Sequence, residues 1–333
     1  MWDTHRLPAH APPFARRRST PFDTSARKTD HALLLLGACN PVASNALLSV
    51  LMRIAHISDF HARRNVPGHP QIPKRRARQM PDLIARAMVD IRDREPDILA
   101  VTGDLIDAPF YGMQDPEMVD RITADLQLIR EIIDPIGCPV LYLFGNHDSP
   151  KAFGNVFPDV NADTLLNGFR FVSFYDEEIR DNAAERLGEQ RKRFDRVLDD
   201  ADNTPQIHLQ HYMIWPENNE GYPHSYREAR ELKSRITASG KVTLSLSGHF
   251  HGGVDTFDAD GTWFATSRAF CEHPHPYRIY DITDEQVLQT DYTIESPDTG
   301  CALFLDMGCL VTDVSDLTEL TAALTEIRGR EWA

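Results

Sequence analysis

The feature that most constrains this chain is a set of short apolar runs, each followed by carboxylate or imidazole residues. Residues 140–144 have the length and composition of a buried strand, and Gly145-Asn146-His147-Asp148 follows them directly. In an open α/β sheet, ligands bind outside the carboxyl ends of the parallel strands. Polar side chains at such an end are therefore well placed for a functional site.

Taken alone, this tetrapeptide is equally well explained as a polar turn that caps a following helix. Four other strand-like runs favour the functional interpretation, because each also ends in carboxylates or imidazoles. The runs comprise residues 53–58, 98–102, 207–210 and 242–247. Their ends carry Asp59 and His61, Asp104 and Asp107, His211, and His249 and His251. Core packing does not require such side chains at five strand ends, so their convergence indicates one site.

The segments between these runs predict helices over residues 74–94, 116–134, 182–202 and 225–239. Further strands are expected at residues 169–174, 277–282 and 287–293, with a hairpin that joins residues 254–257 to 262–266. Residues 153–167 show no regular pattern. The alternation of strands and helices predicts an α/β fold with parallel strand order.

With the ordered motifs D-x-H, GDxxD, GNHD, H and GHxH complete, the chain resembles the calcineurin-like metallophosphoesterase superfamily. It is most similar to the bacterial phosphodiesterase branch, which includes class III cyclic nucleotide phosphodiesterases. Each motif is weak alone, but five in the right order are specific. The resemblance, which covers about residues 52–295, implies a four-layer α/β/β/α sandwich of two mixed sheets flanked by helices. In that fold the metal site lies at the strand ends between the sheets.

The resemblance also implies two divalent or trivalent transition metal ions, with Mn, Fe and Zn as the candidates. The family roles assign Asp59, His61, Asp104 and His251 to the first ion, and Asp104, Asn146, His211 and His249 to the second. His147 is left without a metal, which suits it to bind the phosphate and protonate the leaving group. Asp107 matches the carboxylate that orients this histidine. Asp148 is expected to cap the next helix.

The chemistry of phosphate ester hydrolysis explains why these residue types occur together. A phosphodiester is anionic and resists hydroxide, so catalysis needs charge neutralisation, a nucleophile at neutral pH and a proton for the leaving group. Two metals about 4 Å apart clamp the phosphoryl oxygens and lower the pKa of a bridging water. Imidazole nitrogens and an amide oxygen complete the ligand sets without cancelling all of the positive charge.

Several polar residues near the motifs have a structural interpretation beside the functional one. His211 is favoured over His208 as ligand because it stands at the strand end, and His208 is expected to be a satisfied core or surface histidine. The same structural interpretation applies to His56, His69, His224, His273 and His275. Arg63 and Arg64 follow the first motif and could reach a substrate phosphate, but solvation is the favoured interpretation for both.

The charge balance argues against a long nucleic acid as partner. The formal net charge is −15, and the first 51 residues carry six Lys or Arg against three Asp. The rest therefore holds 29 basic and 47 acidic residues, or −18, whereas binding to a polyanion relies on a basic face. A small phosphate ester stays compatible, because bound metals reverse the local field.

Cysteine usage predicts a cytoplasmic protein. The five cysteines form no CxxC pair and are odd in number, which is typical of free thiols in a reducing compartment. They are Cys39, Cys138, Cys271, Cys301 and Cys309. No apolar run reaches the roughly 20 residues that span a bilayer. Leu36-Gly37-Ala38-Cys39 looks like a lipoprotein cleavage box, so lipoprotein export is the disfavoured alternative.

Composition and motif positions suggest three segments. Residues 1–51 are rich in Pro and Arg and form an expected N-terminal extension, and residues 52–296 form the expected catalytic domain. Residues 297–333 are expected to form a C-terminal βα appendage, with a strand at 302–308 and a helix at 316–328. A homo-oligomer is compatible with this appendage, because a single βα unit cannot bury a core of its own.

The sequence therefore favours a dinuclear-metal phosphodiesterase that hydrolyses small phosphodiesters by attack of a metal-bridging hydroxide. Cyclic nucleotides and glycerophosphodiesters are the candidate substrates. A phosphomonoesterase that acts on nucleotides or phosphoproteins is the first alternative. A catalytically dead binding module on the same fold is the second, and the complete set of site residues disfavours it. Substrate choice is expected to depend on the loops at residues 110–116, 175–180 and 215–226.

Overall fold

The computed structural model describes residues 50–66, 75–109, 113–158, 163–219 and 221–295. The predicted strand and helix after residue 296, His69 and nearly all of the predicted N-terminal extension lie outside these ranges. The three proposed segments therefore stay predictions. No helix in the described ranges combines the length and the hydropathy that a bilayer-spanning segment requires.

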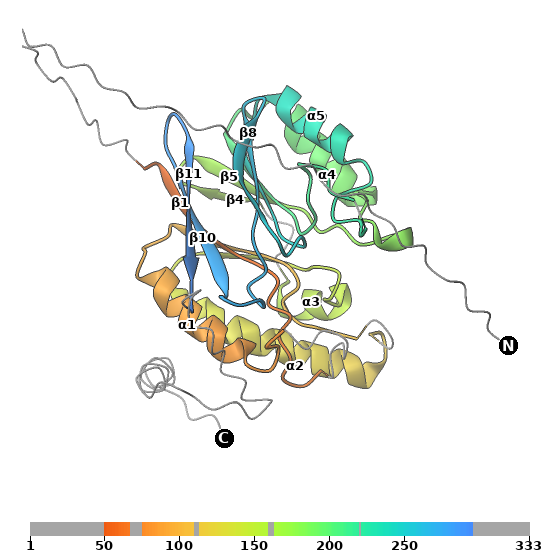
Figure 1. Ribbon diagram of the computed structural model, residues 1–333. Coiled ribbons are helices and arrows are strands. Elements are labelled where there is room, and N and C mark those ends of the chain that lie inside the picture. Colours follow the sequence, from red (N-terminus) through yellow and green to blue (C-terminus); the bar gives the residue numbers. More distant parts are fainter. Residues whose placement is uncertain (1–49, 67–74, 110–112, 159–162, 220, 296–333) are drawn as a thin grey trace, which may run out of the picture. The chain divides into compact units, whose positions relative to one another are not determined.

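In the part of the chain that the structure describes, eleven strands form two mixed sheets (Figure 1). The order in the first sheet is β11 (Val287–Thr293), β10 (Pro276–Ile282), β1 (Met52–Ile57), β2 (Ile98–Thr102) and β3 (Val140–Leu143). The order in the second is β4 (Thr164–Leu166), β5 (Phe169–Ser173), β6 (Gln206–Leu209), β7 (Val242–Ser247), β9 (Thr262–Thr266) and β8 (Val254–Ala259). β1, β2 and β3 are parallel to one another, as are β5, β6, β7 and β9.

Three hydrophobic clusters show how the layers pack. Alternate residues of β1 face opposite sides: Ile54 lies in the cluster between the sheets, and Ile57 in the cluster under the helices of the first sheet. Those helices are α1 (Met80–Arg92) and α2 (Pro116–Ile133). α4 (Gly188–Asp199) and α5 (Ala229–Ser239) cover the second sheet through a third cluster. The predicted α/β/β/α sandwich is therefore confirmed (Figure 1).

Most predicted elements are present, but helix ends and short elements differ. α1, α4 and α5 begin about four to six residues later than predicted. α1 begins beside Pro81, because proline is tolerated only in the first helical turn. Residues 153–167, which were predicted to be irregular, contain most of α3 (Pro150–Val156) and all of β4. Both elements are too short for periodicity to reveal them.

The loop after β1 is held in place by one buried carboxylate on α2. Asp125 accepts hydrogen bonds from the backbone N–H groups of Arg64, Asn65 and Val66 at 2.8–3.0 Å. Asn65 adds a side-chain hydrogen bond of 2.7 Å to the same carboxylate. This clasp fixes the loop that carries Arg63 toward the site.

Candidate metal centre

The polar residues that follow the strands of both sheets lie close together in one site. The nine residues predicted for the site lie just beyond β1, β2, β3, β6 and β7, and seven of them are buried. The buried ones are Asp59, His61, Asp104, Asp107, His147, His211 and His249. Asn146 and His251 are partly exposed. Parallel strand order explains this convergence, because it places the carboxyl ends of neighbouring strands at the same edge.

Asp104 is the centre of the arrangement. Its Oδ2 lies 3.4 Å from His61 Nε2 and its Oδ1 lies 3.5 Å from His211 Nε2, so the two carboxylate oxygens face two different imidazoles. Two groups of ligand atoms share this carboxylate. One comprises Asp59, His61 and Asp104, and the other Asp104, His211 and His249.

The remaining predicted ligands join these two groups. His251 Nε2 lies 3.2 Å from His61 Nε2 and 3.8 Å from Asp59 Oδ1, on the side of the first group. Asn146 Oδ1 lies 3.2 Å from His211 Nε2, on the side of the second. His249 Nε2 is buried and has no hydrogen-bond partner within the described ranges.

Hydrogen bonds on the far side of two rings fix their orientation. His211 Nδ1 donates to Thr102 O at 2.7 Å, and His251 Nδ1 donates to Glu272 Oε1 at 2.8 Å. In each neutral ring the lone pair is therefore on Nε2, which faces the centre. Metal-binding histidines commonly donate their second nitrogen to a carbonyl or carboxylate in this way.

Backbone strain concentrates at the same residues. Asp59, His61, Asp104 and His249 all adopt positive φ values, of 58°, 46°, 52° and 65°. Such conformations cost non-glycine residues of order 1–3 kcal/mol each and persist where the surroundings enforce them. Strain at four converging polar residues is typical of a functional site.

Gly145 is required by the close approach of the two sheets. A Cβ atom at this position would lie 2.3 Å from Asp104 Oδ1 and 2.5 Å from His211 Nε2. Only glycine leaves room for the carboxylate and the imidazole to meet beside this backbone. The glycine that precedes Asn146 in the sequence motif therefore serves the packing of the site.

The electrostatics of the centre fit bound cations. Within the described ranges, no Lys or Arg forms an ion pair with Asp59 or Asp104. Burial raises the pKa of Asp59. Burial lowers the pKa of His211, but Asp104 outweighs it and raises this pKa to about 9. Carboxylate, imidazole and amide donors with no Arg or Lys counter-ion suit transition metal ions.

His147 and Asp107 form the predicted pair beside the centre. His147 Nδ1 donates to Asp107 Oδ1 at 3.0 Å, and the ring of His147 packs edge-on against that of His61. Burial lowers the pKa of His147, but the charge of Asp104 and the hydrogen bond to Asp107 outweigh it, so the pKa is raised. The ring lines the pocket over the centre.

Two arginines lie closer to the site than predicted. Arg63, for which solvation was favoured, has its Nε 3.1 Å from Asp107 Oδ2 and a side chain only 14% exposed, so that prediction is wrong. Arg75, which sequence reasoning missed, lies with Nη1 3.1 Å from His61 Nδ1 and lines the pocket. Arg64 is exposed, as expected. No motif marks Arg75, so only the folded structure shows that it lies at the site.

The prediction that Asp148 caps a helix is wrong. Ser149 is the N-cap of α3, and its hydroxyl accepts from Ala152 N at 3.5 Å. The buried Asp148 carboxylate instead accepts from the backbone N–H groups of Leu105, Ile106 and Gly145 at 2.9–3.1 Å. Asp148 thus ties the loop after β2 to the loop after β3.

The other histidines mostly have the structural role predicted for them. His208 is buried, with its Nε2 2.8 Å from Gln206 Oε1, and His56 Nε2 lies 2.8 Å from Thr102 Oγ1. His275 Nδ1 donates to Phe270 O at 2.7 Å. His224 differs, because it lines the pocket over the centre. Its loop was expected to influence substrate choice, but nothing in the sequence distinguishes this histidine within it.

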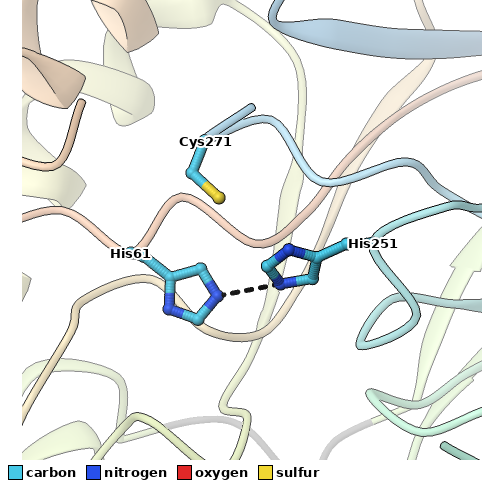
Figure 2. A group of neighbouring side chains, drawn as sticks. All are labelled: His61, His251 and Cys271. Carbon is cyan, nitrogen blue, oxygen red and sulfur yellow. Dashed lines mark hydrogen bonds between the residues drawn. The ribbon is translucent and has the colours of Figure 1, made fainter. Parts of the chain in front are cut away.

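Cys271 is a further residue that sequence reasoning did not place at the site. Its ligand atom and those of His61 and His251 all lie within 4.8 Å of one another. Figure 2 shows its sulfur directed toward the two rings. Burial raises the pKa of this thiol well above its usual value. Cys271 follows the last motif by twenty residues, so only folding brings it to the site.

A pocket of about 370 Å³ opens over the centre. Its lining includes charged and polar residues of the centre, namely Arg75, Asp104, Asn146, His147, His249 and His251. The other lining residues are Tyr222, His224, Phe250 and Gly252. This volume is at the lower end of the range for small-molecule sites. The arrangement thus combines a buried ligand cluster, a histidine–aspartate pair and room for a small substrate.

Comparison with known proteins agrees with this arrangement. The family model for calcineurin-like phosphoesterase matches residues 52–253. A protein of Synechococcus sp. named "probable cyclic nucleotide phosphodiesterase" is 22% identical over 207 residues, which cover 61% of this chain and 74% of that protein.

Two solved structures share the fold. A dimetal phosphatase from Danio rerio has a TM-score of 0.56 and 14% identity, over 74% of this chain and 97% of that chain. The purple acid phosphatase PPD1 from yellow lupin has a TM-score of 0.53 and 14% identity, over 74% of this chain and 52% of that chain. The family uses dinuclear metal centres. The chain therefore belongs to the calcineurin-like phosphoesterase family and is a metal-dependent hydrolase.

Proposed function

We propose that the protein is a dinuclear-metal phosphodiesterase that hydrolyses small phosphodiesters. The observation that carries this proposal is the shared Asp104 carboxylate, whose two oxygens face His61 and His211 at 3.4 and 3.5 Å. A single buried carboxylate between two sets of nitrogen and oxygen donors is the arrangement that a bridging ligand needs. The adjacent pair of His147 and Asp107 supplies the proton donor.

In this proposal, each of the candidate ligands binds one of two ions, and Asp104 binds both. Asp59, His61, His251 and Asp104 would hold the first, and Asn146, His211, His249 and Asp104 the second. The bound ions would neutralise the phosphoryl oxygens and lower the pKa of a water. The protein contributes the fixed directions of the ligands, because Thr102 and Glu272 orient two of the imidazoles.

His147 acts as the general acid in this proposal. It must hold a proton to stabilise the departing alkoxide, and its raised pKa favours the protonated ring at neutral pH. Asp107 binds Nδ1–H, so the proton on Nε2 is the one available to the leaving group. The need for such an acid is greatest for alkyl leaving groups, whose alkoxides are strong bases.

The size and charge of the protein support a small diester. A pocket of about 370 Å³ admits a small molecule, and a net charge of −15 disfavours long nucleic acid. The name of the Synechococcus relative supports the diester over the monoester. Cyclic nucleotides are therefore the first natural substrates to assay.

Hydrolysis of bis(nitrophenyl) phosphate and of nitrophenyl phosphate tests the proposal. Metal-stripped protein would be reloaded with Mn, Fe or Zn and compared with Asp104→Asn and with the surface control Glu117→Gln. We expect metal-dependent turnover of the diester and a loss of at least about 10³-fold in Asp104→Asn, comparable to losing a main electrostatic stabiliser. Preference for the monoester, or two tightly bound metals in Asp104→Asn, would contradict the proposal.

A further inference from the structure

One side of the pocket is made of aromatic rings. Tyr222, His224 and Phe250 line the same pocket as Asp104 and His147, and all three rings are partly exposed. Their centroids follow one another at 5.2 Å from Tyr222 to His224 and 4.9 Å from His224 to Phe250. We call these three residues the aromatic wall.

The aromatic wall begins at the metal-ligand cluster. The ring of His249 lies 5.8 Å from that of Tyr222 and 5.5 Å from that of His224. A phosphate held at the cluster would therefore have its ester groups beside the wall. These separations are short enough for one small molecule to contact both the metal-ligand cluster and the aromatic wall.

Backbone and side-chain contacts hold the wall in place. His224 N donates to Asn218 O at 3.0 Å, and His224 O accepts from Met213 N at 3.2 Å. Tyr222 OH donates to Glu178 Oε1 at 3.2 Å. The rings are thus ordered before any ligand binds, which lowers the entropic cost of binding.

Gly252 leaves the space that Phe250 occupies. A Cβ atom at Gly252 would lie 3.0 Å from Cζ of the Phe250 ring. A side chain at this position would force the Phe250 ring to shift by a few tenths of an ångström. The glycine beside the last motif thus serves the wall.

The same pocket also carries positive charge. Arg75 lines it with a side chain that is 7% exposed, and its buried Nε has no hydrogen-bond partner within the described ranges. Two metal ions would add to this charge. A neutral planar group suits such a pocket better than a quaternary ammonium, because Arg75 and the ions would repel the ammonium.

We infer that the aromatic wall binds the nucleobase of a nucleotide phosphodiester and so sets the substrate class of the enzyme. This inference rests on the proposed phosphodiesterase function. Bases stack on aromatic rings with little regard to sequence, because every base has a π-face. Partly exposed rings beside a phosphate site offer that surface, whereas glycerol and other aliphatic groups gain little from it.

The test compares a diester that has a base with one that lacks it. The substrates are 3′,5′-cyclic AMP, the matching cyclic ribose phosphate without a base, and glycerophosphocholine. The variants are Tyr222→Ala, His224→Ala and Phe250→Ala. Trp215→Leu is the matched control, because Trp215 lies in the same loop and contacts Lys233 but does not line the pocket. All variants would be checked for metal content and melting temperature.

We expect each wall variant to raise KM for cyclic AMP about tenfold, equivalent to about 1.4 kcal/mol, since stacking contributes roughly 1–3 kcal/mol per base. The base-free diester should change by less than about twofold. Equal losses on both diesters, or no loss on either, would overturn the inference. A selective loss on glycerophosphocholine would also overturn it, in favour of an ammonium site.

The outcomes separate this inference from the proposed function. If the wild-type protein hydrolyses the base-free diester as well as cyclic AMP, base binding by the aromatic wall is refuted and the proposed phosphodiesterase function is retained. Wild-type protein that hydrolyses only monoesters refutes the proposed function. In that case the wall would be retested with AMP against ribose 5-phosphate, and an equal response to both would reject base binding altogether.

Discussion

Two buried ionic clusters in this molecule differ in whether their charges balance. One is the candidate metal centre, and the other, the Arg186 cluster, consists of Arg186, Asp176 and Tyr226. Arg186 Nε donates to Asp176 Oδ2 at 3.0 Å, and Tyr226 OH donates to the same oxygen at 2.6 Å. At the metal centre, Asp59 and Asp104 have imidazoles as partners but no Arg or Lys ion pair within the described ranges.

The difference indicates separate purposes. The Arg186 cluster supplies its own counter-ion and places its guanidinium 3.9 Å from the centroid of the Phe174 ring, so it joins the loop after β5 to the loop after β6. The candidate metal centre has no Arg or Lys counter-ion within the described ranges, and its carboxylates face imidazoles that can bind metal. Buried charge that the chain does not compensate is therefore a better guide to function than buried charge as such.

The largest effect on stability should come from breaking the balanced cluster. Asp176→Asn leaves the buried Arg186 without its counter-ion, which we expect to cost about 3–5 kcal/mol of unfolding free energy. Denaturant unfolding measures this. The control Glu117→Gln breaks an exposed ion pair with Arg121 and should cost less than about 0.5 kcal/mol. Equal costs for the two variants would show that the Arg186 cluster does not hold the loops together.

Removal of metal should have the next largest effect. At a free metal concentration about 100 times the dissociation constant, binding stabilises the folded state by about 2.7 kcal/mol. A chelator should therefore lower the melting temperature by about 5–11 °C. The chelator should lower the melting temperature of Asp176→Asn by the same amount, because the Arg186 cluster binds no metal. The decrease should be smaller for Asp104→Asn. Full loss of the shift in Asp176→Asn would contradict the separation of the two clusters.

The smallest effect should be a change in pH dependence at the edge of the centre. The hydrogen bond to Asp107 raises the pKa of His147, so the acid form persists to higher pH, and activity falls only as pH rises through this value. Asp107→Asn removes that contribution, and the falling limb of kcat should move to lower pH. The pH profiles of the wild type and of Asp107→Asn should be compared on a diester with a poor leaving group. An unmoved limb would show that His147 is not the acid being titrated.

Periodicity was a good guide to the strands and to the ligand motifs. Apolar runs buried on both faces, such as β1 and β2, leave little choice of secondary structure. Periodicity was a poor guide to helix ends and to short elements such as α3, because a single turn carries too few residues to show a period. The role of Asp148 was missed because its three backbone partners include two from the loop after β2, about forty residues earlier.

The sequence by itself determined which side chains end the strands, and thereby the types of candidate ligand, since local patterns decide where a strand stops. Only the tertiary structure decided that Arg63, Arg75 and Cys271 lie beside the residues of the candidate metal centre. The same is true of the ring of His224. These residues come from loops whose positions depend on the packing of two sheets and on clasps such as Asp125. Contacts between residues so distant in the chain have no local signature in the sequence.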